Sequence, residues 1–439
     1  MAPADGAKVM DPKVQKVLRE QGLEGRRLYL PHMPYGGSYL LASAIRSIGM
    51  EAWPTTDSNE RTLELGGRVT SGEECYPQRI CIGDFLRIIE DEGRENVAFL
   101  MPTANGPCRF GQYLHLIRTT FDEMGYQDIP LITITSNDGY QSIGDYSIDL
   151  VRTAWRAVVA QDILMKALLK TRPYERHKGD ADRVYLDSIV EVGEALSLMG
   201  VSHRQRLAAV RAALLKARDR FRAIPADYDR TRPLIGVVGE IFCRSNTFAN
   251  FDLVRVVEEH GGECWLADIG EWVWYTDDEH RRRLEAEGRK YSVEAAVRVI
   301  TTKIQRADEH ALYRDWKDDF VGYEEPHDVR EVLRMSEPYL PYNGALGEMV
   351  LSTGKSIYLY EKGADGIIDI SPFSCMNGIV TQAVYPLVQR DLDGLPIRVF
   401  YFDGTQADLE RDVGIFIELA RTYQRRKKKV RRYPAYFGA

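Results

Sequence analysis

Four segments of the chain share one pattern of apolar and polar residues. Each has a short apolar run, then a glycine-containing loop, then an amphipathic run of helical length; they are residues 26–54, 96–134, 233–268 and 364–404. Short β-rich runs that alternate with amphipathic helices are typical of parallel sheets with right-handed crossovers. The pattern therefore predicts an α/β fold.

Two further stretches are predicted to be helical. The first, roughly residues 148–226, includes "AWRAVVAQDILMKALLK", in which apolar residues recur at helical spacing. The second is a polar insertion at about 277–335. We therefore predict two Rossmann-like parallel-sheet domains with a helical connector and a helical insertion. The predicted boundaries are an N-terminal extension at 1–23, an N-terminal α/β domain at 24–147, the connector at 148–232, a C-terminal α/β domain containing the insertion at 233–420, and a basic tail at 421–439.

Composition narrows the class of protein. The 439 residues suffice for two or three domains, and 44% hydrophobic with 28% charged residues is usual for a soluble globular chain. The net charge of −7 argues against general nucleic-acid binding. There is no apolar stretch of the ~20 residues that a membrane span needs, and the N-terminus has no apolar signal-peptide core. We therefore expect a cytoplasmic protein with neither a nucleic-acid nor a membrane partner.

One local run of charge stands apart from this acidic average. Residues 425–432, "RRKKKVRR", are strongly basic. We interpret the run as the solvated end of a helix, because charge runs usually lie on solvated faces. The alternative is a docking patch for an acidic partner or a phosphate-bearing ligand.

Three cysteines occupy equivalent places in the predicted topology. Cys108 and Cys375 each follow a predicted strand and precede a predicted helix, and Cys75 stands just before Pro77, a favoured first-turn residue. Ligands of open α/β sheets bind at the carboxyl ends of the strands, and helix N-termini favour the thiolate. The flanking loops "ANGPCRFG" and "SPFSCMNG" supply small residues that let backbone amides approach a bulky anionic group. Each cysteine taken singly could equally be a buried core residue.

The other three cysteines have different surroundings. Cys243 follows "VVGEIF" in the same position after a strand and is the best candidate for a further ligand. Cys81 falls about one turn into the helix after Pro77, so it is either near the site or simply buried. Cys264 lies inside a predicted strand, and we expect it in the core. The spacing of the six matches neither the CxxC pairs of zinc sites nor the compact ferredoxin run.

Several motifs together resemble one protein family. "TSGEECYPQRICIGDFL", "MPTANGPCRFGQY", "VVGEIFCRSNTFAN" and "ISPFSCMNGIVTQAV", with "RPYE" at 172–175, are similar to the activase-associated branch of the 2-hydroxyacyl-CoA dehydratase and benzoyl-CoA reductase subunit superfamily. The resemblance runs from about residue 26 to about residue 420. It implies flavodoxin-like domains around an iron–sulfur cluster.

The resemblance also implies cofactors and partners. Cys75, Cys108 and Cys375 would hold a 4Fe–4S cluster and leave one iron without a cysteine ligand. Electrons of low potential would come from an ATP-dependent activase of actin-like fold that carries its own 4Fe–4S cluster, and a homologous subunit could complete a homo- or heterodimer. We find no phosphate-binding glycine loop of the actin-like type, so the ATPase would be another chain. A double-cubane 8Fe–9S cluster is the alternative; it takes six cysteines, against which the position of Cys264 argues.

The expected function is a redox enzyme or enzyme component that reduces or dehydrates a substrate, with an acyl-CoA as one candidate. Arg109 could balance the cluster's charge and Glu73 and Glu74 could relay protons, although all three could be ordinary surface residues. Glu240 and Asn246 are further pocket candidates. Two other hypotheses remain open: an electron relay or cluster carrier without catalysis, and a thiol-based or zinc-stabilised binding protein.

Overall fold

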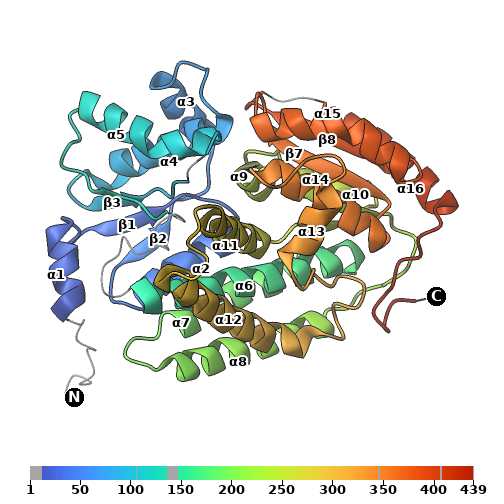
Figure 1. Ribbon diagram of the computed structural model, residues 1–439, viewed down its shortest axis with the longest axis horizontal. Coiled ribbons are helices and arrows are strands. Elements are labelled where there is room, and N and C mark those ends of the chain that lie inside the picture. The colour runs from blue at the N-terminus through green and yellow to red at the C-terminus, as the bar shows by residue number, and fades with distance from the viewer. Residues whose placement is uncertain (1–11, 105, 136–146, 345–346, 406–407, 439) are drawn as a thin grey trace.

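Two four-stranded parallel sheets form the frame of the protein (Figure 1), in a computed structural model that describes residues 12–104, 106–135, 147–344, 347–405 and 408–438. The first sheet has the order β2-β1-β3-β4, with strands β1 (Arg27–Leu30), β2 (Ala52–Pro54), β3 (Val97–Leu100) and β4 (Leu131–Ile132). The second has the order β6-β5-β7-β8, with strands β5 (Leu234–Gly239), β6 (Glu263–Leu266), β7 (Gly366–Pro372) and β8 (Ile397–Phe402). The prediction of an α/β fold with two parallel-sheet units is confirmed.

Helices connect the strands, as parallel neighbours require. Around the first sheet these are α1 (Pro12–Glu20), α2 (Tyr35–Arg46), α3 (Glu60–Arg68), α4 (Tyr76–Glu92), the short 3-10 helix η1 (Arg109–Gln112) and α5 (Tyr113–Glu123). Around the second they are α9 (Ile241–Ser245), α10 (Leu253–Glu259), α11 (Ile269–Ala286), α14 (Glu348–Glu361), α15 (Met376–Asp391) and α16 (Leu409–Arg426). Strands β3, β5 and β7 are buried along their whole length, as is usual in parallel sheets covered by helices.

A helical layer lies against both sheet units and fills the two stretches predicted to be helical (Figure 1). It comprises α6 (Ser147–Thr171), η4 (Arg172–Tyr174), α7 (Asp180–Leu196), α8 (His203–Ala223), α12 (Val293–Tyr313), η5 (Arg314–Trp316) and α13 (Val329–Ser336). Arg152 and Arg156 of α6 both bind Asp308 of α12 at 2.8 Å, so the connector and the insertion are tied together. None of the helices within the described ranges combines the length and the apolar content that crossing a bilayer takes.

The basic run near the C-terminus differs from its prediction as a solvated helix end. Helix α16 ends at Arg426, and beyond it Arg431 is buried, with its guanidinium 2.7 Å from the Glu263 carboxylate of β6. Lys427 lies 2.7 Å from the buried Asp365. Buried carboxylates need cationic partners, and part of this run supplies them.

The two sheet units meet near the carboxyl ends of their strands. Asn246, just after α9, donates from Nδ2 to the backbone oxygen of His32 at 2.8 Å, across the junction. Tyr76, at the start of α4, packs so closely on Gly404 that a Cβ there would lie 3.0 Å from its ring. This junction brings together loops that are far apart in the sequence.

Candidate functional site

Cys75, Cys108 and Cys375 stand in one backbone conformation, each directly before a helix. Their φ/ψ angles are −62/134°, −69/133° and −65/125°, at the starts of α4, η1 and α15. Cys375 is set by a tight turn in which its N–H donates to Pro372 at 3.0 Å and Ser374 has a φ of +62°. The predicted placement of the three cysteines at helix starts is therefore seen in the structure.

Cys108 and Cys375 lie close enough to Cys75 to affect the ionisation of its thiol. Burial is the largest cause that raises the pKa of Cys75, and the charges of Glu240, Cys375 and Cys108 raise it further. Burial also raises the pKa of Cys108 to about 11 and that of Cys375 to about 12, while backbone N–H groups at the helix starts act in the opposite direction. Since such effects fade with distance, the fold gathers two thiols of the first unit and one of the second at the junction.

Cys243 and Cys81 are buried near Cys75. Cys243 is fully buried in α9, and its pKa is raised by burial, then by Glu240, then by Cys75 and Cys375. Cys81 is buried in α4. Its pKa is raised first by burial and then by the charges of Asp84, Glu240 and Cys75. Cys81 is thus both buried and near the site, the two possibilities that its sequence position left open, and the predicted role of Cys243 as a further ligand stays a prediction.

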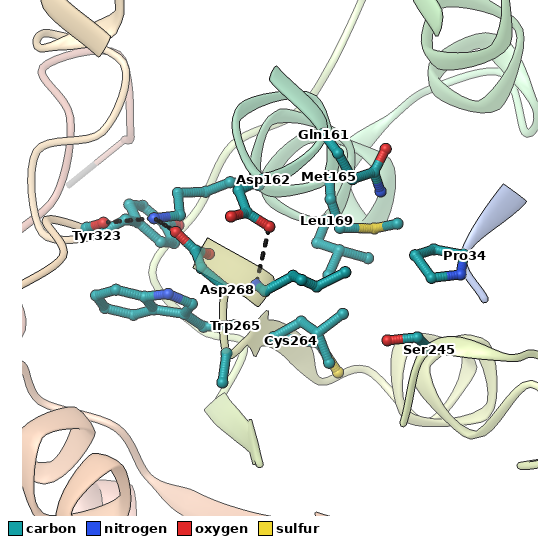
Figure 2. A pocket seen from close by; sticks show the side chains of 14 residues that line it. Pro34, Gln161, Asp162, Met165, Leu169, Ser245, Cys264, Trp265, Asp268 and Tyr323 are labelled. Atoms are coloured by element: carbon teal, nitrogen blue, oxygen red, sulfur yellow. Dashed lines mark hydrogen bonds and ion pairs between the residues drawn. The ribbon is translucent and has the colours of Figure 1, made fainter. Parts of the chain in front are cut away.

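Cys264 lies elsewhere. It is buried in β6, and burial raises its pKa together with the charges of Glu258 and Glu263 rather than those of the other thiols. Figure 2 shows it on the wall of a cavity beside Met165 and Leu169. That cavity, of ≈ 20 Å³, has room for about one water molecule. All six cysteines are free thiols.

Two carboxyl groups of the second unit face the thiols. Glu240, directly before α9, accepts from the backbone N–H of Phe242 at 3.1 Å and of Cys243 at 2.7 Å. Glu348, the first residue of α14, is buried and accepts from the N–H of Ile241 at 2.8 Å. Burial raises the pKa of Glu240, and burial followed by the charge of Glu240 raises that of Glu348 to about 8. The site thus holds a carboxyl group that titrates near neutral pH.

Arg244 and Tyr113 complete the surroundings. Arg244 is buried, donates to the Gly239 oxygen at 2.6 Å, and opposes the rise in pKa of both glutamates. The Tyr113 hydroxyl, at the start of α5, hydrogen-bonds the Cys75 thiol. Neither residue, nor Glu348, was selected from the sequence. For Tyr113 the signal was available, since "GPCRFGQY" places it five residues after Cys108.

The remaining predicted site residues have structural partners. Arg109 is exposed and donates to the backbone oxygen of Glu73, which links the Cys108 loop to the Cys75 loop. Glu73 is exposed, and the Glu74 carboxylate accepts from the N–H groups of Ser71 at 2.9 Å and Gly72 at 3.0 Å. Asn246 is buried in the junction described above. Their predicted catalytic roles stay predictions.

The donor set suits a multinuclear cluster better than a single ion. Among the described residues no group of three or more His, Cys, Asp or Glu side chains is arranged to hold one metal ion. The thiolates of a four-iron cluster are held apart by the body of the cluster, so they need not meet that standard. Three free thiols from separate loops, approached by backbone N–H groups, fit such a group because soft thiolates select iron–sulfur clusters and amides balance their charge.

Comparison with known proteins identifies no family for this chain. The chain matches no protein-family model and no curated protein. The resemblance to the dehydratase superfamily therefore depends on the motifs quoted above, and the case for a function depends on the geometry of the cysteine site.

Proposed function

We propose that this chain is an iron–sulfur protein of the 2-hydroxyacyl-CoA dehydratase type, in which Cys75, Cys108 and Cys375 hold a 4Fe–4S cluster. The observation that carries the proposal is the convergence of three free thiols, from three loops and two sheets, in one backbone conformation. A bound cluster of this kind supplies electrons of low potential and an iron that can polarise a substrate oxygen.

The residues around the thiols would tune and serve this centre. The N–H groups at the starts of η1 and α15 and the buried guanidinium of Arg244 offset negative charge. Glu348, with a pKa of about 8, keeps its proton at neutral pH and is a candidate acid for a departing hydroxyl group. In this proposal the electrons come from a separate ATP-dependent activase of actin-like fold with its own 4Fe–4S cluster, and the substrate is an acyl-CoA.

Two alternatives differ in support. A double-cubane 8Fe–9S cluster needs six cysteine ligands, and Cys264 stands apart from the other five. An electron relay without catalysis has one observation in its favour: the cavity lined by Arg244, Ile241 and Glu348 has ≈ 10 Å³, too little for an acyl chain. In a catalytic protein the substrate would have to enter by another route, such as the face shared with a partner subunit.

Anaerobic purification tests the proposal. Iron and sulfide quantitation should give about four of each per chain, with an EPR signal on reduction. A chain that stays free of iron after anaerobic reconstitution would overturn the proposal. Turnover with an activase and candidate acyl-CoAs separates the two roles, because a relay takes up electrons without forming product.

A further inference from the structure

Glu240 occupies, in the second sheet unit, a place like that of the cysteines. Its φ/ψ angles of −64/130° match those of Cys75, Cys108 and Cys375, and like them it stands directly before a helix. Its N–H donates to the oxygen of Ile370 at 2.8 Å, so Glu240 lies beside the end of β7, the strand that leads to Cys375. A side chain starting from this position reaches the space that the thiols share.

The surroundings of the thiols agree with that placement. The charge of Glu240 acts on Cys75, on Cys108 and on Cys375, whereas Glu348 acts on Cys108 and Cys375. Glu240 also acts on Cys243 and on Tyr113. A carboxylate that influences every one of these groups lies in their midst.

The carboxylate is held in the manner of a metal ligand. Its two oxygens each accept one backbone N–H, from Phe242 at 3.1 Å and Cys243 at 2.7 Å. Each carboxylate oxygen has a second lone pair, and ligating carboxylates are commonly oriented by such hydrogen bonds. The nearby Arg244 guanidinium compensates the charge. The carboxyl group is therefore held in a fixed orientation, with lone pairs left to bind a metal.

We propose that the Glu240 carboxylate is the fourth, non-thiolate donor of the metallocentre, an inference that rests on the proposed function. Three cysteines leave one iron of a 4Fe–4S cluster without a protein ligand, and iron accepts carboxylate oxygen readily. A carboxylate ligand here would slow the loss of that iron from the cluster. It would also be exchangeable, because its hydrogen bonds to Phe242 and Cys243 keep it in place when a substrate oxygen takes over the position.

The test measures iron rather than turnover. Full-length wild type, Glu240→Gln and Glu240→Asp are reconstituted anaerobically with ⁵⁷Fe, with Glu348→Gln as the matched control because it removes the neighbouring carboxyl from the same site. Mössbauer spectra report whether one iron has an oxygen ligand. A chelator challenge, followed by the EPR signal of the three-iron form, gives the rate at which that iron is lost.

We expect Glu240→Gln to lose the distinct iron site in the spectrum and to release one iron roughly tenfold faster than wild type or more, the usual scale for losing a ligand-sphere group. Glu240→Asp should change in the same direction, since it retains a carboxyl group and helix capping but withdraws that group by one methylene. Glu348→Gln should stay within about twofold of wild type, because it is no donor. Circular dichroism of the apo-proteins checks that each variant folds, and the aspartate variant keeps the test valid if the glutamine variant does not.

Two results would overturn the inference. Glu240→Gln with the wild-type spectrum and iron-loss rate would show that the side chain is only a helix cap. Equal acceleration in Glu348→Gln would show a general effect of acidity at the site. Both presuppose a wild type that holds its cluster; a wild type without iron would instead refute the proposed function and the inference with it.

Discussion

The two sheet units have the same strand order but present different chemistry at equivalent positions. Numbered within each unit, both sheets run 2-1-3-4. The third strands, β3 and β7, both lead to a cysteine, Cys108 and Cys375. The first strands lead to Pro34 before α2 and Glu240 before α9, with φ/ψ of −62/132° and −64/130°. After the third strand, both units therefore have a cysteine. After the first strand, only the second unit has a carboxyl group.

The second strands diverge further. After β2 the chain passes through α3 before it reaches Cys75. After β6 it reaches Asp268, which lies in a buried charged network 3.3 Å from Lys166 and 3.0 Å from the Tyr313 hydroxyl. The first unit thus contributes two thiols to the junction, and the second contributes one thiol and the carboxyl groups. A pseudo-symmetric frame can therefore build a site to which its two halves contribute different side chains.

The largest expected effect tests the equivalence of the third strands. Cys108→Ser and Cys375→Ser should each reduce iron from about four per chain to nearly none, because each removes one of the three proposed cluster ligands. Cys264→Ser is the matched control: it should keep its iron and lose only about 1–2 kcal/mol of stability, since it buries a hydroxyl group in β6. Iron and sulfide analysis with EPR measures the first outcome, and urea denaturation measures the second. Equal iron loss in all three variants would favour the six-cysteine cluster.

The next-largest effect is on stability, and it concerns Gly239 at the end of β5, the first strand of the second unit. Gly239 has a φ of +112°, and a Cβ there would lie 2.1 Å from the oxygen of Ile370. Gly239→Ala should therefore destabilise the protein by about 3 kcal/mol, through backbone strain and a clash that pushes β5 away from β7. Gly25→Ala is the control, because Gly25 also has a positive φ, +77°, with no atom within 4 Å of the added carbon. It should cost about 1–2 kcal/mol. Urea midpoints of the apo-proteins give both values, and equal shifts would contradict the clash.

The sequence predicts the backbone of this arrangement better than it predicts which side chains meet. Alternating strand-like and helix-like runs specify parallel sheets, and parallel strands bring Cys108 and Cys375 to carboxyl edges. The sequence also predicts that Cys264 lies inside a strand, and it lies in β6. These predictions succeed since they depend on short-range periodicity.

Side-chain convergence depends on contacts that local pattern does not contain. Glu348 reaches the site from α14, more than one hundred residues after Glu240, and no motif marks it. Arg431 belongs to a run that resembles a solvated tail, yet the buried Glu263 draws it inside. Arg431 is positioned by a buried carboxylate and Glu348 by a backbone N–H of α9, and both contacts belong to the tertiary fold.

A smaller effect concerns the pH dependence of the carboxyl side of the site. Glu348 has a folded-state pKa of about 8 against an ordinary value of 4.5, so the folded protein retains a proton that the unfolded chain releases. Stability should therefore fall as pH rises from about 4.5 to about 8 and then level off. Glu348→Gln should lack this slope and gain roughly 1–2 kcal/mol over wild type across that interval, less than the full linkage value because Glu240 titrates beside it. Urea unfolding of the apo-protein at several pH values measures the difference, which should grow with pH; a constant difference would be evidence against a buried, protonated Glu348.

The smallest effect tests whether Glu74, next to Cys75, has a structural or a catalytic role. Partial burial acts to raise the pKa of Glu74, but the N–H groups of Ser71 and Gly72 outweigh it, so the pKa lies below its ordinary value. The charged form thus stabilises the loop above pH 4.5, and this contribution is lost as pH falls below it. Glu74→Gln should therefore cost less than about 1 kcal/mol at pH 7 and leave the iron content unchanged, as expected for an accessible loop contact. If it also leaves turnover with the activase unchanged, proton transfer belongs to the carboxyl groups of the second unit. A fall in turnover at full iron content would instead return that role to the Cys75 loop, and the division of labour between the two units would not hold.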